Sequence, residues 1–353
     1  MEEIKNKFQF LVAALRIKEW WNYKIQLLLA GAYWGISMNK IYFKLAFADL
    51  FLLVVWLFGV FSLGYFINNI YDSRQDIVAG KNNLTTVISP KSKIIITIFL
   101  MILVFSPWFF IHSNYILLTL VIIHFILAIL YSMPPIRFKE KGILGIIDCA
   151  LIEISLPLLI IIFSFSSLSN FGDISSIVIL IAVWSFFFGA RNILFHQIND
   201  YKNDTISGVK TFVVRYGLNF SVKSIDYAVL PVELLTFLLL IYFYSFQKFT
   251  YYIIPVFIIG AILITIILKI SAPKHLLQPK NFNTNSMKMI YNMLNAVYEM
   301  ILPFSIIIHL IITDKKYLIF LMIHILLFRK SVIGFIFKIH ELIRMRRWSR
   351  KIM

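Results

Sequence analysis

Long apolar stretches alternate with short polar breaks along most of this 353-residue chain. Each stretch holds roughly 20 predominantly hydrophobic residues, the length that a helix needs to cross a hydrocarbon core about 30 Å thick. We therefore predict an all-α, polytopic membrane protein with about nine transmembrane helices. The predicted spans are residues 24–40, 44–69, 93–112, 115–132, 143–164, 175–197, 226–246, 251–271 and 290–312.

The segment that follows the ninth predicted span is apolar again from residue 317 to 337, with an interruption at Arg329 and Lys330. A tenth, interrupted span would return the basic tail to the cytoplasm, whereas a pair of interfacial helices would fit the short apolar lengths. We expect the tenth span. The predicted organisation is a transmembrane domain at 1–313 and a hydrophobic and basic C-terminal extension at 314–353.

Basic residues are distributed unevenly between the breaks. Lysine and arginine number 34 against 17 acidic residues, and the breaks after the second, fourth, sixth and eighth spans each carry several of them, whereas the breaks after the third, fifth and seventh are nearly uncharged. Because positive residues accumulate in cytoplasmic loops, the N-terminus is expected inside, and the excess charge gives no reason to expect nucleic-acid binding. The apolar core at residues 8–15 is too short for a cleaved signal, so we expect a surface helix there.

Two acidic stretches end apolar runs more than a hundred residues apart. In the first, Asn68, Asp72 and Asp76 recur at every fourth position, which places them on one face of a helix. In the second, Asp200 and Asp204 have the same spacing. The topology predicted from the basic residues puts both stretches at the cytoplasmic ends of their spans.

Four carboxylates at the ends of membrane helices need counter-charge if they converge. A divalent metal would supply it. Mg²⁺ takes few carboxylates and keeps other positions for water and phosphate oxygens, so the arrangement suits a metal-bridged diphosphate better than an all-protein cage. The alternative is two solvated helix ends whose aspartates only terminate the spans.

Three motifs in this order resemble those of the UbiA superfamily of intramembrane prenyltransferases. They are Asn68-x-x-x-Asp72-x-x-x-Asp76, the tyrosine and proline turn from Tyr131 to Lys139, and Asp200-x-x-x-Asp204. The resemblance covers about residues 16–312. It implies a helical bundle around a central cavity that opens sideways to lipid.

The resemblance also implies an activity, which is Mg²⁺-dependent transfer of a prenyl group from an isoprenyl diphosphate to a lipophilic or aromatic acceptor. By position, Asn68, Asp72 and Asp76 would hold one Mg²⁺, and Asp200 and Asp204 the other. The four aspartates would be the catalytic residues. The expected partners are the two substrates and the lipid bilayer, and nothing in the sequence indicates an obligate protein partner.

Further candidate site residues lie in or near these motifs. Many family members carry aspartate directly after the first asparagine, where this chain has Asn69, an amide that adds no charge. The candidates for binding diphosphate oxygens are Lys81, Arg137, Lys139 and Lys210. The candidates for other substrate contacts are Asn69, Tyr131, Ser132, Arg191 and His196.

Some polar residues fall within the spans. His196 shares a helix face with Asp200, so it could orient that carboxylate, act as a base, or be hydrogen-bonded for structure. Asp148 and Glu153 in the fifth span are better candidates for lining a cavity than for lipid contact.

Two other functions fit parts of the pattern. A terpene cyclase of the same fold would ionise the same diphosphate and quench the cation internally. A cation-coupled secondary transporter would also use intramembrane carboxylates, but transporters favour them near the midplane of broken helices. The helix-end position of these aspartates favours the prenyltransferase.

Overall fold

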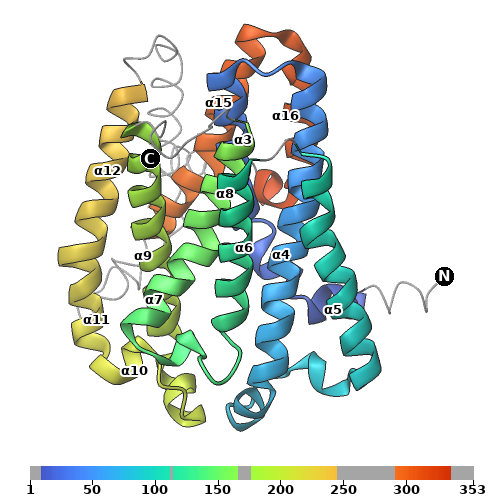
Figure 1. Ribbon diagram of the computed structural model, residues 1–353. Coiled ribbons are helices and arrows are strands. Elements are labelled where there is room, and N and C mark those ends of the chain that lie inside the picture. The colour runs from blue at the N-terminus through green and yellow to red at the C-terminus, as the bar shows by residue number, and fades with distance from the viewer. Residues whose placement is uncertain (1–8, 112–113, 166–175, 245–290, 335–353) are drawn as a thin grey trace, which may run out of the picture. The chain divides into compact units, whose positions relative to one another are not determined.

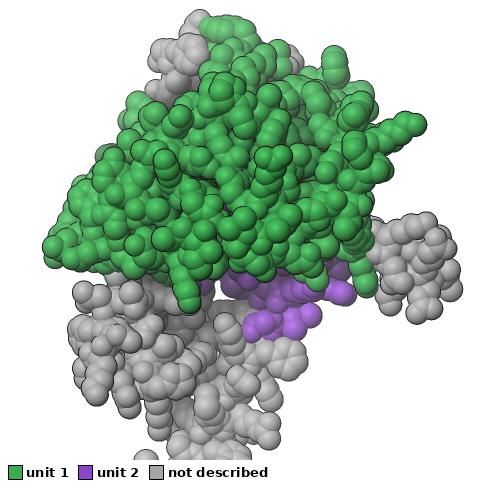
Figure 2. Space-filling model, turned by 90° about the horizontal axis from the view of Figure 1, so that it is seen from below, with its two compact units in different colours: residues 1–21, 38–243 green, residues 22–37, 244–353 purple. Residues whose placement is uncertain are grey.

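A computed structural model describes residues 9–111, 114–165, 176–244 and 291–334. Every regular element in these ranges is a helix, which confirms the all-α prediction. The chain forms two compact units, one of residues 1–21 and 38–243 and the other of residues 22–37 and 244–353 (Figure 2). The predicted domain boundary after residue 313 stays a prediction.

The first unit contains the helices that carry both acidic stretches. The α-helices are α2 (Ile17–Trp20), α4 (Phe43–Val78), α5 (Pro90–Phe105), α6 (Tyr115–Leu130), α7 (Ile143–Ala150), α8 (Leu156–Ser164), α9 (Ser176–Ser207), α10 (Phe212–Tyr216), α11 (Leu218–Ser224) and α12 (Leu230–Tyr244). Three short 3₁₀ helices connect them, η1 (Leu84–Val87), η2 (Ser106–Phe109) and η3 (Phe138–Glu140). Two π-helical turns, η4 (Leu151–Ser155) and η6 (Ile225–Val229), lie within longer helices.

The second unit contains most of α3 (Lys24–Asn39), the π turn η10 (Val297–Ile301), α15 (Leu302–Thr313), the 3₁₀ helix η11 (Lys315–Tyr317) and α16 (Leu318–Leu327). A hydrogen bond of 3.1 Å between the Tyr33 hydroxyl and His324 Nδ1 joins α3 to α16. Helix α16 ends before Phe328, and helical structure resumes at residues 329–334. This break fits an interrupted span and an interfacial pair equally, so the tenth span stays a prediction.

Six of the described helical segments are long and apolar enough to cross a membrane. They correspond to the predicted spans 44–69, 93–112, 143–164, 175–197, 226–246 and 290–312. Helices α3 and α6 correspond to two more and have 16 residues each. The predicted span 251–271 lies outside the described residues. The polytopic membrane fold is therefore as predicted.

Helices α4 and α9 continue past the ends predicted for their spans. Helix α4 extends to Val78, and Gly80 with a φ of 68° follows it. Helix α9 extends to Ser207 and is followed by Gly208 with a φ of 72°. Glycine adopts these left-handed angles without the steric cost of a Cβ, so it favours the end of a helix. The acidic stretches are consequently helical throughout, which keeps the spaced aspartates on one face.

Close packing holds α9, which carries the second acidic stretch, against α7 and holds α7 against η3. Figure 1 shows α4 beside α5 and α7 beside α9, and both pairs are in contact. A Cβ at Gly189 of α9 would lie 2.9 Å from the Cα of Ala150 at the end of α7. A Cβ at Gly145 of α7 would lie 2.7 Å from the Phe138 carbonyl oxygen. The missing side chains let α9 approach α7, and α7 approach η3.

Candidate functional site

A cavity of about 310 Å³ lies in the first unit and brings the two acidic stretches together. Its walls come from the acidic ends of α4 and α9, the N-terminal segment, the loop after α4 and the turn before α7. Ten of the residues singled out from the sequence line it: Asn68, Asn69, Asp72, Asp76, Lys81, Tyr131, Lys139, His196, Asp200 and Asp204. Residues remote in sequence thus share one polar chamber.

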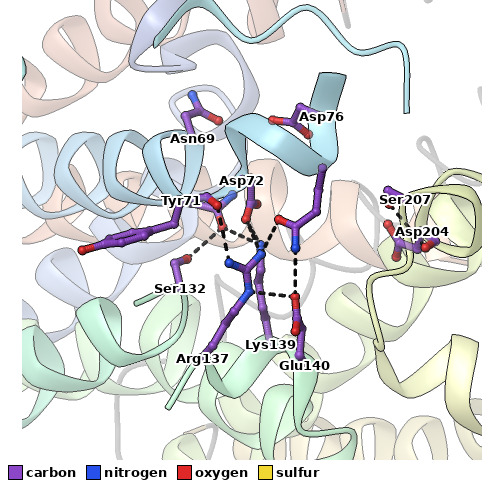
Figure 3. Close-up of polar contacts among 12 residues, drawn as sticks. Asn69, Tyr71, Asp72, Asp76, Ser132, Arg137, Lys139, Glu140, Asp204 and Ser207 are labelled. Atoms are coloured by element: carbon purple, nitrogen blue, oxygen red, sulfur yellow. Dashed lines mark hydrogen bonds and ion pairs between the residues drawn. The ribbon is translucent and has the colours of Figure 1, made fainter. Parts of the chain in front are cut away.

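Asp72 is the centre of the α4 side of the cavity (Figure 3). Its carboxylate forms an ion pair with Lys139 and a second one, of 2.9 Å, with Arg137 Nη2. Arg137 has a left-handed backbone with a φ of 45°, which is unfavourable for a residue with a Cβ. The charge-assisted contacts with Asp72 and Glu140 offset that cost.

Lys139 is almost completely buried, with 7% of its surface exposed. Burial lowers the pKa of its ammonium group below the ordinary value, and the Asp72 carboxylate acts in the opposite direction. The ammonium also lies 3.4 Å from Asn68 Oδ1, which accepts a 2.8 Å hydrogen bond from the Ser132 hydroxyl. Ser132 therefore lies behind the cavity wall and orients Asn68.

Asp76 is bound by a residue that the sequence analysis did not single out. The side-chain amide of Asn83 donates a hydrogen bond of 2.7 Å to Asp76 Oδ2 and another of 2.7 Å to the Asn69 carbonyl oxygen. Asn83 Oδ1 accepts from the backbone N–H and the hydroxyl of Thr85. An asparagine just before the short helix η1 is a capping signal, but its contacts with α4 are tertiary.

The α9 side of the cavity has its own counter-charge. Lys81 Nζ donates to Asp200 Oδ2 at 3.0 Å, so the loop after α4 contacts the second acidic stretch. His196 Nε2 lies 3.9 Å from the same oxygen. Asp204 Oδ2 accepts a 3.4 Å hydrogen bond from the Thr211 hydroxyl. Both partners of the Lys81 pair are partly exposed, so the pair contributes little to stability and can open readily.

Six of the singled-out residues do not line this cavity, and two of them are Asp148 and Glu153 of the fifth predicted span. Arg137 and Ser132 contact residues that do. Lys210 is exposed, and its carbonyl oxygen accepts a hydrogen bond from Arg215. Arg191 is fully buried and forms a two-fold ion pair with Glu233 of α12, at 2.7 and 3.0 Å. Their roles toward substrate stay predictions.

The N-terminal segment forms part of the cavity wall through Arg16 and Glu19. It is fastened to α4 by the Asn69 side-chain amide, which donates a 3.1 Å hydrogen bond to the Ala14 carbonyl oxygen. The Trp20 ring stacks on Phe61 of α4, with ring centroids 5.6 Å apart. Asn69, the position at which this chain departs from the common motif, therefore has a structural contact that a carboxylate could not make.

Replacing Asn69 with aspartate is expected to loosen the N-terminal segment. An ionised aspartate has no donor, so its oxygen would face the Ala14 carbonyl in a buried position, which costs about 1–3 kcal/mol. Hydrogen exchange of the backbone amides at residues 9–20 should accelerate by about tenfold or more, since each 1.4 kcal/mol is a factor of ten in the opening equilibrium. Mass spectrometry of peptides from this segment measures the change.

Asn219 provides the control, because it is exposed on α11 and the same amide-to-carboxylate change there leaves the contact intact. The Asn219→Asp variant should exchange as the parent does. Unchanged exchange at residues 9–20 in the Asn69→Asp variant would show that the contact with Ala14 does not hold the segment.

The oxygen ligands in the cavity fit a hard divalent cation. Carboxylates from two helices and the Asn68 amide line the same chamber, and oxygen is the ligand that Mg²⁺ prefers. Within the described ranges, no three acidic, histidine or cysteine side chains lie close enough to form a metal cage on their own.

Comparison with solved structures shows the same fold elsewhere. A UbiA homologue from Archaeoglobus fulgidus bound to GPP and Mg²⁺ matches with a TM-score of 0.53 and 19% identity, over 84% of this chain and 99% of that one. The same homologue bound to DMAPP and Mg²⁺ gives a TM-score of 0.55, 19% identity and coverage of 84% and 98%. A structure concerned with digeranylgeranylglyceryl phosphate synthase in membranes gives 0.56 and 18%, over 85% of this chain and 99% of that one.

No curated protein matches the sequence. The model of the UbiA prenyltransferase family, however, matches residues 28–290, which is most of the chain and includes all three motifs. With the fold and the shared cavity already described, this match shows that the chain is an integral membrane protein that belongs to the UbiA prenyltransferase family.

Proposed function

We propose that this protein transfers a prenyl group from an isoprenyl diphosphate to a lipophilic or aromatic acceptor within the membrane, with Mg²⁺ as the cofactor. One observation carries the proposal: the acidic ends of α4 and α9 line the same cavity together with basic side chains. The binding of GPP or DMAPP with Mg²⁺ by the Archaeoglobus fulgidus homologue supports it.

The metal would be held by the asparagine and the aspartates of the two stretches, which are Asn68, Asp72, Asp76, Asp200 and Asp204. When bound, Mg²⁺ would stabilise the negative charge that develops on the departing diphosphate. The carboxylates project from two long helices, and α9 packs directly on α7. Their positions are consequently set before a substrate arrives, which reduces the reorganisation needed during the reaction.

The basic residues would bind the diphosphate oxygens. Lys139 and Arg137 already lie against Asp72, and Lys81 against Asp200, so each is at the edge of the proposed metal site. A diphosphate can take over these contacts because it offers several anionic oxygens, which suit ammonium and guanidinium groups. Lys210 would need a loop movement to join them, since it is exposed outside the cavity lining.

The orientation in the membrane is part of the proposal. The basic breaks after the even-numbered spans favour a cytoplasmic N-terminus, and both acidic stretches then face the cytoplasm. Their shared cavity agrees with a single side of entry. A diphosphate would enter from water while its prenyl chain and the acceptor approach from the bilayer.

The deciding experiment measures diphosphate release by the purified full chain with farnesyl and geranylgeranyl diphosphate. We expect release that requires Mg²⁺, stops with a chelator and is accompanied by a prenylated acceptor when phenols, naphthols or long-chain alcohols are added. Steady release with a cyclic hydrocarbon product and no transfer would indicate the terpene cyclase. No release with either diphosphate, together with solute flux in liposomes, would indicate the transporter.

A further inference from the structure

One acidic side chain lies deeper in the membrane than the two acidic stretches and close to their cavity. Glu153 belongs to the π turn η4, inside the span Ile143–Ser164, and is half-buried. The hydroxyl of Tyr65 on α4 donates to Glu153 Oε1 at 3.3 Å. A carboxylate is costly at this depth, so such residues usually serve a function.

Contacts with two neighbouring helices, α6 and α9, hold the π turn that carries Glu153. A π turn contains one residue more than the corresponding α-helical turn, which changes the direction of the side chains within it. The carbonyl oxygen of Ile152 accepts a 2.8 Å hydrogen bond from Nε2 of His124, a buried residue of α6. The close approach of Gly189 to Ala150 packs α9 against the start of the same turn. Glu153 is therefore presented by a rigid, well-packed element.

Glu153 is connected to the cavity through two tyrosines. Tyr65 lies three residues before Asn68 and seven before Asp72 on α4, so it is about 10 Å deeper than Asp72 on a similar face. Tyr131 lines the cavity and lies within electrostatic range of both Glu153 and Asp72. The guanidinium of Arg16 lies over the Tyr65 ring, 5.3 Å from its centre. Glu153 does not line the cavity itself, but it lies next to it, within electrostatic range of Tyr131, which does.

We propose that Glu153 is the group that accepts the proton lost by the acceptor during prenyl transfer. This rests on the function proposed above. The C–O bond to the diphosphate breaks and its electron pair leaves with the diphosphate. A bond forms between the allylic carbon and the acceptor oxygen or aromatic carbon, and the proton from that atom passes to the Glu153 carboxylate, which Tyr65 orients. The substrate class is an acceptor with a removable proton, such as a phenol or an alcohol.

The Glu153→Gln variant separates this role from a structural one. The amide oxygen of glutamine still accepts the hydrogen bond from Tyr65, but the amide does not take up a proton. With labelled geranylgeranyl diphosphate and a panel of phenols, naphthols and long-chain alcohols, transfer should fall by about 10²- to 10⁴-fold, the usual contribution of a general base. Mg²⁺-dependent diphosphate release without an acceptor should stay near the parent level. The rise of the transfer rate with pH should also disappear in the acidic range.

Two further variants complete the test. Tyr65→Phe keeps the carboxylate and should reduce transfer by about tenfold or less, since one hydrogen bond is lost. Asp226→Asn is the matched control, because Asp226 is the acid of another π turn, η6, in the separate helical segment Leu218–Phe243. It should transfer as the parent does.

Several results would overturn the proposal. One is normal transfer with an unchanged pH profile in Glu153→Gln. Another is an equal loss of transfer and of acceptor-free diphosphate release, which would mean that Glu153 supports the structure of the site. A loss of transfer in His196→Gln with none in Glu153→Gln would assign the proton to His196 instead. Parent protein that releases diphosphate but prenylates no acceptor would overturn this inference and leave the diphosphate site standing.

Discussion

Replacing Asp72 with alanine is expected to reduce diphosphate release by about a thousandfold, which corresponds to ~4 kcal/mol of lost stabilisation of the leaving group. Asp72 is the carboxylate on which Lys139 and Arg137 converge, so its removal takes away a proposed metal ligand and leaves two cations without this partner. Asp200→Ala should have an effect of similar size, because Asp200 is the corresponding proposed ligand on α9. Release is measured with purified protein at saturating Mg²⁺.

Asp49 is the control for Asp72. It is a second buried acid on α4, more than five helical turns away from Asp72, and it does not line the cavity. Asp72→Asn and Asp49→Asn are both isosteric, so both proteins should insert and fold. We expect the first to lose activity and the second to keep it. Near-normal release by folded Asp72→Asn would count against the metal assignment.

Replacing Arg191 with leucine is expected to destabilise the protein by about 3–5 kcal/mol, since a buried pair loses one partner and Glu233 stays buried with an uncompensated charge. Both side chains are fully buried, and the two contacts at 2.7 and 3.0 Å join α9 to α12. The thermal unfolding temperature of the purified protein in detergent measures the loss. Salt should have little influence on the difference in unfolding temperature between the variant and the parent, because an ion pair without solvent contact is poorly screened.

The double variant Arg191→Met with Glu233→Leu provides the comparison. Removing both charges and keeping the volume usually restores most of the stability that one substitution removes. We therefore expect the double variant to unfold near the parent temperature. If the single and double variants unfold at the same reduced temperature, the lost stability belongs to packing and not to the ion pair. If the double variant also binds prenyl diphosphate normally, Arg191 has no direct contact with that substrate.

Much of this architecture could be predicted because it depends on local signals. Twenty-residue apolar lengths indicate membrane helices, and a spacing of four places Asn68, Asp72 and Asp76 on one face whatever the rest of the chain does. The end of α4 was less predictable. The sequence becomes polar at Asn68, which suggests a span boundary, yet the helix continues to Val78 because no glycine or proline intervenes before Gly80.

The unpredicted part of the site depends on contacts between distant segments. Nothing local indicates that Asn83 binds Asp76, or that the Asn69 amide reaches the carbonyl of Ala14. The π turn around Glu153 was also not evident, since one additional residue in an apolar helix leaves the hydrophobic pattern unchanged. The ion pair of Arg191 with Glu233 was not evident either, because the two residues lie 42 positions apart in the chain.

The side chain of Asn83 uses its whole hydrogen-bonding capacity. Its nitrogen donates twice, to α4 at Asn69 and Asp76, and its oxygen accepts twice from Thr85. Aspartate lacks the donors, serine lacks the reach and glutamine adds a methylene that the buried position cannot accommodate without displacing η1. Any of these replacements should therefore release the loop after α4 from the first acidic stretch, and with it the Lys81 side chain that reaches Asp200.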